Sequence, residues 1–141
     1  MFRTSLLAAA FTVGCLSAAS SAAIDYRATL SGKSEVPPTT SNGSGDVLAT
    51  LDTASKKLSY TLTYLGLSGP ATAAHFHGPA AAGVNAGVVV PIGTNPASPS
   101  TGSVTLTDAQ MKDLEAGNWY ANVHTDANKG GEIRGQLMRA K

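Results

Sequence analysis

Residues 57–65, Lys-Leu-Ser-Tyr-Thr-Leu-Thr-Tyr-Leu, alternate between polar and apolar side chains. Successive side chains of a β-strand point to opposite faces of a sheet. The apolar face holds Leu58, Tyr60, Leu62 and Tyr64, and the polar face holds Ser59, Thr61 and Thr63. We therefore expect a strand that packs its apolar face on a core and leaves the other face to solvent.

The same period continues through the rest of the chain from Ile24, with turn residues about every eight to twelve positions. Such spacing predicts an all-β fold, an antiparallel Greek-key β-sandwich of about eight strands. The expected strands are 24–30, 45–51, 57–65, 71–77, 87–92, 101–106, 118–125 and 132–138. One short helix is expected at 108–116, with Thr107 as its N-cap and Gly117 beyond its C-terminus.

The first 23 residues differ in character from the rest of the chain. Arg3 precedes an apolar stretch that ends in small residues at Ala23, which is typical of a secretory signal peptide cleaved near that position. We expect residues 24–141 to be one domain of a secreted or periplasmic protein, without a transmembrane segment. A lipoprotein anchored through Cys15 is the alternative for this segment.

The charge balance limits the partners of the protein. Ten Lys and Arg residues stand against nine Asp and Glu residues among 141, so the chain lacks the basic excess of a nucleic-acid-binding protein. The only cysteine is Cys15, which the predicted cleavage removes. A metal ion bound by the mature chain would therefore be held by imidazole or carboxylate rather than by thiolate.

The three histidines fall on one side of the strand pattern. Ala74 and Phe76 point inward in strand 71–77, which turns His75 and His77 outward, and His124 is outward in strand 118–125. Two imidazoles at alternate positions of a strand can converge on one ion, and a third from a neighbouring strand completes three nitrogen ligands. The same outward face is expected to hold Tyr120, Asn122, Glu132 and Arg134.

A hairpin turn at 126–131 that pairs Val123 with Ile133 would place Glu132 opposite His124. Glu132 is therefore expected either to supply a fourth ligand or to accept a hydrogen bond from the free ring N–H of His124. The ordinary alternative is that the histidines are polar side chains on a solvated face. Glu35 lies in a turn, where the default expectation is a solvated carboxylate, and Arg134 is expected to pair with Glu132 at the surface.

Several ordered blocks of the sequence resemble a known family. They are Leu30-Ser31-Gly32 with Glu35-Val36-Pro37-Pro38, then residues 73–80, Leu106-Thr107 with Gln110 and Leu114, then residues 117–125, and residues 131–137. Together they are similar to the CHRD domain, named from its copies in chordin. The resemblance implies a secreted or periplasmic domain, but it implies fold and location better than activity.

A more distant resemblance concerns one strand. Ala74-His75-Phe76-His77-Gly78 is similar to the copper-binding strand of Cu/Zn superoxide dismutases, which are also β-sandwiches. Three histidines are too few for the dinuclear site of those enzymes. We therefore expect a binding module that holds copper, with zinc as the alternative ion. A metal-free protein-interaction domain ranks second, and a mononuclear copper redox enzyme ranks third, so an enzyme is the less expected outcome.

Overall fold

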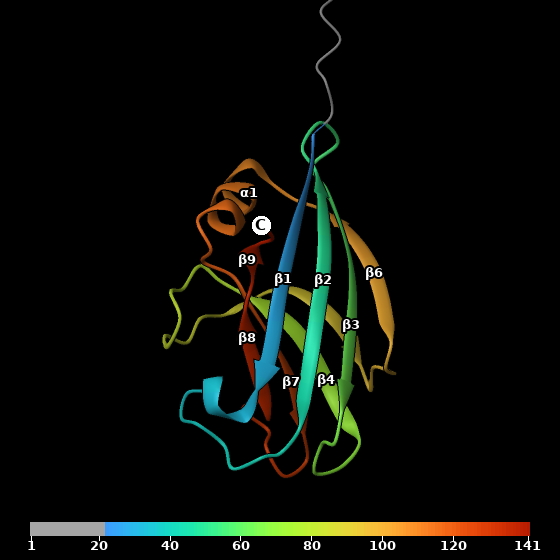
Figure 1. The fold of residues 1–141 in the computed structure, drawn as a ribbon, viewed down its shortest axis with the longest axis vertical. Coiled ribbons are helices and arrows are strands. Elements are labelled where there is room, and N and C mark those ends of the chain that lie inside the picture. The colour runs from blue at the N-terminus through green and yellow to red at the C-terminus, as the bar shows by residue number, and fades with distance from the viewer. Residues whose placement is uncertain (1–21) are drawn as a thin grey trace, which may run out of the picture.

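The computed structural model describes residues 22–141, and residues 1–21 of the expected signal peptide lie outside this range. Within the described range, the strands form one antiparallel sheet that curls over on itself around a single interior (Figure 1). The strands are β1 (Ala23–Ser31), β2 (Ser44–Asp52), β3 (Lys57–Leu65), β4 (Ala71–His77), β5 (Val88–Thr94), β6 (Ser100–Thr105), β7 (Tyr120–Thr125), β8 (Ile133–Gln136) and β9 (Met138–Arg139). The predicted all-β class is confirmed.

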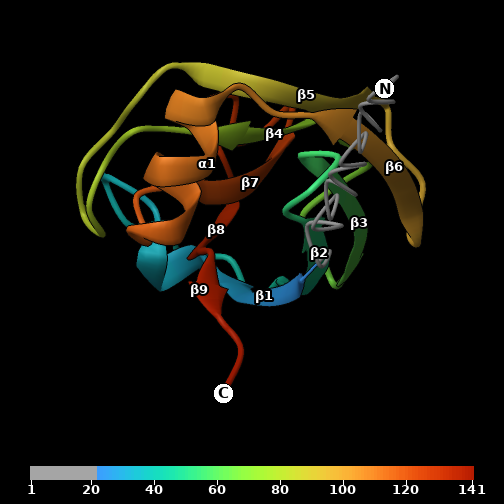
Figure 2. The same ribbon diagram turned by 90° about the horizontal axis from the view of Figure 1, so that it is seen from above.

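The strand order is β5-β4-β7-β8-β1-β2-β3-β6, with the short β9 paired to β1. Viewed from above, the layer containing β4, β5 and β7 faces the layer containing β1, β2 and β3 (Figure 2). The expected strand 132–138 is divided into β8 and β9, because Leu137 lies between them and donates its backbone N–H to the carbonyl of Trp119. The expected pairing of Val123 with Ile133 is confirmed.

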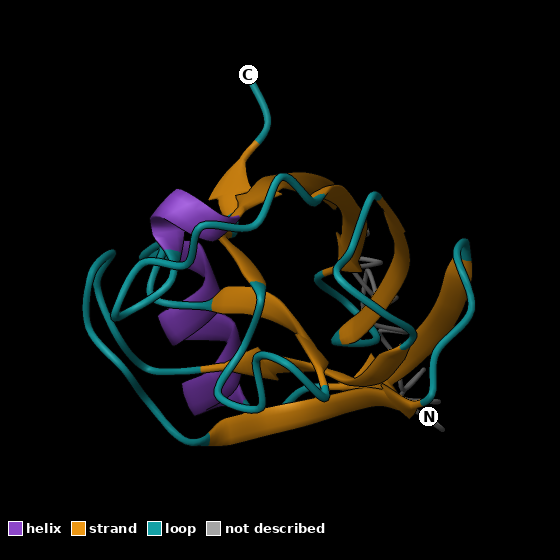
Figure 3. Ribbon diagram, turned by 90° about the horizontal axis from the view of Figure 1, so that it is seen from below, coloured by secondary structure: helices purple, strands orange, loops and turns teal. Residues whose placement is uncertain are grey.

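The core is built from the side chains that the two-residue period places inward. Seen from below, the strands curve around the interior of the molecule (Figure 3). The inward side chains fill this interior. Its largest apolar members are Trp119, Tyr26, Phe76, Leu30, Leu51, Leu58, Leu62, Leu114, Ile133 and Leu137. The ring of Phe76 lies edge-on to that of Tyr60, with centroids 5.1 Å apart.

In residues 22–141 two helical segments accompany the sheet, the 3-10 helix η1 (Gly32–Ser34) and the helix α1 (Asp108–Glu115). The predicted N-cap of α1 is confirmed, since the Thr107 hydroxyl accepts from the backbone of Gln110 and the Gln110 side chain accepts from the backbone of Thr107. The chain leaves the helix through Gly117 at φ +74°, a conformation that favours glycine. None of the helices in residues 22–141 has the length and apolar character needed to cross a membrane.

Candidate metal centre

The outer face of β4, β7 and β8 carries a layer of polar and aromatic side chains. We call this set the outer polar layer; its members are His75, His77, Tyr120, Asn122, His124 and Arg134. The strand pattern predicts all of them on this face, but most of the face is not in contact with solvent. His77, Tyr120, Asn122 and Arg134 are buried, and only His75 and His124 are half-buried.

Two loops cover the layer and explain its burial. The Asn85 side chain of the loop 78–87 donates to the carbonyl of Val36, so the two loops are joined to each other above the sheet. Arg134 donates from Nη1 to Asn85 Oδ1 at 2.9 Å and from Nη2 to the carbonyl of Val84 at 2.6 Å. The segment 35–40 and the loop 78–87 therefore form a lid that β8 holds in place.

The three histidines come together as predicted. One ligand atom from each of His75, His77 and His124 lies within 4.8 Å of the other two. His75 Nδ1 and His124 Nε2 are 3.1 Å apart. With metal–nitrogen bonds of about 2.0–2.1 Å, this separation gives an N–metal–N angle of about 98°. That angle lies between the right angle of square-planar coordination and the tetrahedral angle, so these two nitrogens are spaced as neighbouring ligands of one ion.

The backbone fixes the proton on His124. Its Nδ1 lies 2.9 Å from the carbonyl oxygen of Lys129, which can only accept, so a neutral His124 carries its proton there. The lone pair of Nε2 then faces Nδ1 of His75. In the metal-free protein this contact holds one proton between two nitrogens, and an ion bound by both of these nitrogens would require the proton of neutral His75 to move to its Nε2.

Burial and mutual proximity keep two of the imidazoles neutral. Burial lowers the pKa of His75, and the neighbouring His124 and His77 lower it further. Burial also lowers the pKa of His77, against the hydrogen bonds that it makes with Ala86 and Asn122. Neutral imidazole is the form that binds a metal, so both side chains are ready to bind at pH 7.

His77 is held by an aromatic stack. Its ring lies parallel to that of Tyr120, with centroids 4.7 Å apart and planes 2° from parallel. The guanidinium carbon of Arg134 lies 3.4 Å from the centroid of the same tyrosine ring. The Tyr120 hydroxyl and His77 Nδ1 both contact the carbonyl oxygen of Ala86. The stack therefore fixes both the plane and the rotation of the His77 imidazole.

The structure does not bring Glu132 to the histidines. Glu132 lies just before β8, where the alternation of the strand does not apply, and its carboxylate is buried among other donors. These donors are the hydroxyls of Ser41, Ser68 and Thr125, the backbone N–H of Ser68 and the amide of Asn128. The expectations that Glu132 hydrogen-bonds His124 and that it pairs with Arg134 are therefore wrong, and its carboxylate already has donors on both oxygens.

These donors set the charge of Glu132. Burial by itself raises the pKa of the carboxyl, but the hydrogen bonds from Ser41, Ser68 and Thr125 outweigh it and bring the pKa to about 2. The carboxylate is thus ionised at neutral pH. It joins the segments around residues 41, 68 and 125, which gives Glu132 a structural role.

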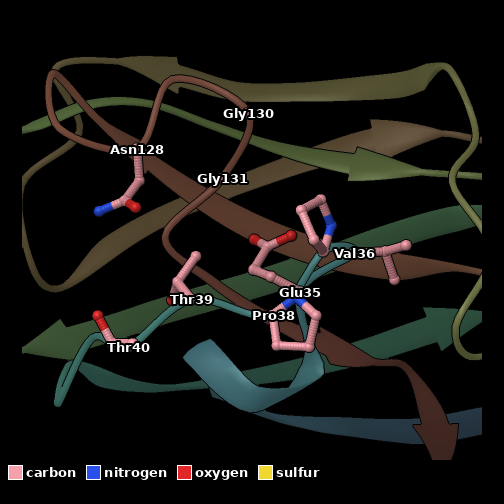
Figure 4. Close-up of a pocket in the computed structure, with 9 residues that line it drawn as sticks. Glu35, Val36, Pro38, Thr39, Thr40, Asn128, Gly130 and Gly131 are labelled. Atoms are coloured by element: carbon pink, nitrogen blue, oxygen red, sulfur yellow. The ribbon is translucent and has the colours of Figure 1, made fainter.

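Sequence reasoning missed Glu35. It was expected to be a solvated turn residue, but it is only 5% exposed because the segment 35–40 passes over the sheet. Glu35 lines a pocket of about 420 Å³. Figure 4 shows its carboxyl group between the segment 36–40 and the turn that contains Gly130 and Gly131. Burial raises its pKa to about 7, although Arg134, the backbone of Val36 and the amide of Asn122 act to lower it. The spacing of apolar residues carries no signal for a loop that folds back in this way.

The chain matches a known protein family. A family model described as the CHRD domain matches residues 26–137, which is most of the chain. No curated protein and no solved structure shows significant similarity to it.

Proposed function

The chain belongs to the CHRD domain family, and we propose that it is a secreted or periplasmic metal-binding module in which His75, His77 and His124 hold one copper ion. The observation that carries the proposal is the convergence of three imidazoles from two strands, with the His75 and His124 nitrogens 3.1 Å apart. Three histidines that only solvated a surface would have no reason to converge, with His77 buried and the other two half-buried.

The ligand set favours copper over zinc. Sites built from nitrogen bind Cu²⁺ more tightly than Zn²⁺, and imidazole suits both ions. No carboxylate or thiolate in residues 22–141 belongs to the group of converging ligand atoms. The three nitrogens therefore leave a coordination position for water or a small molecule. Zinc is the second candidate for the same site.

Thermal unfolding of the metal-free protein tests the proposal. An ion that binds only the folded state stabilises it by RT ln(1 + [L]/Kd), which is about 2.7 kcal/mol at a concentration of 100 Kd. We expect Cu²⁺ to raise the melting temperature, Zn²⁺ to raise it less, and a chelator to reverse both effects. The protein should retain one copper per chain after dialysis.

The matched variants separate this site from adventitious binding. The triple variant His75→Ala/His77→Ala/His124→Ala should lose the bound copper. Met138→Leu removes an exposed thioether on β9, which pairs with β1 and not with the strands that carry the histidines, and this variant should retain the copper. Stoichiometric copper on the triple variant after dialysis would refute the proposal.

The other two candidate functions give different results in the same experiments. A metal-free interaction domain would show unfolding that no ion shifts and partner capture that a chelator does not affect. A copper redox enzyme would turn over superoxide faster than an equal amount of free copper. We place the binding module first because the described site shows converging ligands, whereas no feature in residues 22–141 identifies a substrate.

A further inference from the structure

The outer face of β4 and β7 holds a block of polar side chains, two from each strand. β4 contributes His75 and His77, and β7 contributes Asn122 and His124. The pairing register puts the Cα of Asn122 opposite that of His75, so the amide lies among the three imidazoles. The histidines are the proposed copper ligands, and Asn122 is the member of the block whose role is still open.

The side chains of the block make contact along its two diagonals. His75 Nδ1 lies 3.1 Å from His124 Nε2, and His77 Nε2 lies 2.9 Å from Oδ1 of Asn122. The oxygen of a side-chain amide is a neutral donor with two lone pairs, and some copper sites include such an oxygen. Each diagonal therefore brings together two atoms that can bind a metal.

The spacing of both pairs is that of neighbouring ligands of one ion. With bonds of about 2.0–2.1 Å, the separation of 2.9 Å between His77 and Asn122 gives an angle of about 90° at the ion. Tetrahedral coordination would hold neighbouring ligand atoms about 3.3–3.4 Å apart, farther than in either diagonal pair. Right angles are typical of Cu²⁺, and the tetrahedral angle is typical of Zn²⁺. The two contacts therefore fit Cu²⁺ better than Zn²⁺.

Folding holds the amide of Asn122 in this orientation. The residue is only 3% exposed, and its Nδ2 packs against Gly131, where a Cβ would lie 2.6 Å away. The oxygen is thereby left facing His77. The carbonyl oxygen of Ala86 lies 3.0 Å from Nδ1 of His77 and can accept the single N–H of the neutral ring there. Nε2 of His77 is then available to an ion that Asn122 also binds.

We propose that Oδ1 of Asn122 is the fourth ligand of the copper ion that the three histidines hold. It takes the coordination position that three imidazoles leave to water or a small molecule. This inference rests on the proposed function and makes it more specific. Four protein ligands suit a protein that holds or carries an ion, whereas an enzyme keeps one position open for its substrate.

Pulsed electron paramagnetic resonance of the copper-loaded protein tests the proposal. The protein is labelled with ¹³C in the side-chain amide of its asparagines. A coordinated amide places this carbon next to the unpaired electron of Cu²⁺, so we expect a strong ¹³C hyperfine coupling beside the nitrogen couplings of the imidazoles. The ¹³C coupling should disappear in Asn122→Ala, in which every other asparagine is still labelled.

The same variant should open the coordination position. Asn122→Ala should bind copper at least about 10-fold more weakly, since even the loss of a group behind the ligands costs that much. Added azide should leave the copper spectrum of the wild type unchanged and should shift that of Asn122→Ala, because azide can bind where the amide was.

Gln136→Ala is the matched control. Its amide comes from the neighbouring strand β8 but donates to the carbonyl oxygens of Ala80 and Gly117. This variant should keep the ¹³C coupling of the wild type and its indifference to azide.

Three results would overturn the inference while copper remains bound. They are a wild type without the ¹³C coupling, a coupling that persists in Asn122→Ala, and a wild-type spectrum that azide shifts as it shifts that of the variant. The wild-type spectra decide the question even if Asn122→Ala fails to fold. A wild type that binds no copper would instead refute the proposed function, and this inference with it.

Discussion

Glu35→Gln should change how the stability of the protein depends on pH. The buried carboxyl has a pKa of about 7 in the folded protein and an ordinary value of 4.5. Because the folded pKa is raised, the folded state binds the proton more tightly than the unfolded state. The contribution of Glu35 is therefore fully present below about pH 4.5 and is lost as the pH rises toward 7. A glutamine does not titrate and removes this dependence.

The magnitude follows from the two pKa values. One unit of difference corresponds to about 1.4 kcal/mol, so ionisation of Glu35 lowers the free energy of unfolding by about 3 kcal/mol across this range. His75 and His77 act in the opposite direction, because their lowered pKa values make stability rise with pH below their ordinary value of 6.5. The wild-type profile alone mixes both effects. The difference between wild type and Glu35→Gln isolates the carboxyl.

Urea unfolding of both proteins at intervals from pH 5 to pH 8, without metal and with chelator, measures that difference. Between pH 5 and pH 8 we expect the free energy of unfolding of Glu35→Gln to rise by about 2–3 kcal/mol relative to that of the wild type. This change does not depend on the difference in stability between the two proteins at pH 5. Glu115→Gln, at an exposed position of α1, should follow the wild type throughout. Parallel profiles for the wild type and Glu35→Gln would show that the carboxyl is not held in the buried environment described above.

Three further substitutions test other parts of the structure by the same unfolding measurement. Glu132→Gln should lower the free energy of unfolding by about 3 kcal/mol at pH 7, and the deficit should vanish as the pH falls from 4.5 toward 2, because the lowered folded pKa stabilises only the ionised form. Gly131→Ala should cost about 2 kcal/mol or more, since φ is +128° and the Cβ would overlap Glu35; an equally stable variant would contradict this geometry. Thr107→Ala should cost about 1 kcal/mol through loss of the helix cap, and a change below a few tenths would show that the cap contributes little.

The sequence predicts the strands and the direction of their side chains because both depend on local alternation. Leu58 and Leu62 are fully buried, as the pattern at residues 57–65 requires. The same alternation turns His75 and His124 to one face, and the pairing of β4 with β7 that the structure shows brings them into contact. The convergence of the three histidines could therefore be predicted from pattern and topology alone.

The environment of that site could not be predicted in the same way. Segments 35–40 and 78–87 lack periodicity, and their position over the sheet depends on long-range hydrogen bonds such as Arg134 to Val84. The alternation of polar and apolar residues predicts the face of the sheet on which a side chain lies. It does not predict whether a loop from elsewhere in the chain covers that face. For this reason the prediction that Asn122 and Arg134 lie on the outer face is correct, whereas Arg134 is buried instead of lying at the surface and Glu35 is buried instead of lying in a solvated turn.

The covering loops bear directly on metal binding. Ordering a free imidazole for coordination costs side-chain entropy. In this protein the imidazoles are already ordered by folding, because Tyr120 stacks on His77 and the carbonyl oxygen of Lys129 accepts a hydrogen bond from His124. His77 is buried while His75 and His124 remain half-buried, so an ion would reach the site from the side of the more exposed pair. Folding thus orients the ligands beneath the lid and leaves two of them within reach of solvent. A site arranged in this way should bind its ion through adjustments of the side chains rather than of the backbone, because both nitrogens of His77 face oxygen atoms and one of them must be freed for coordination.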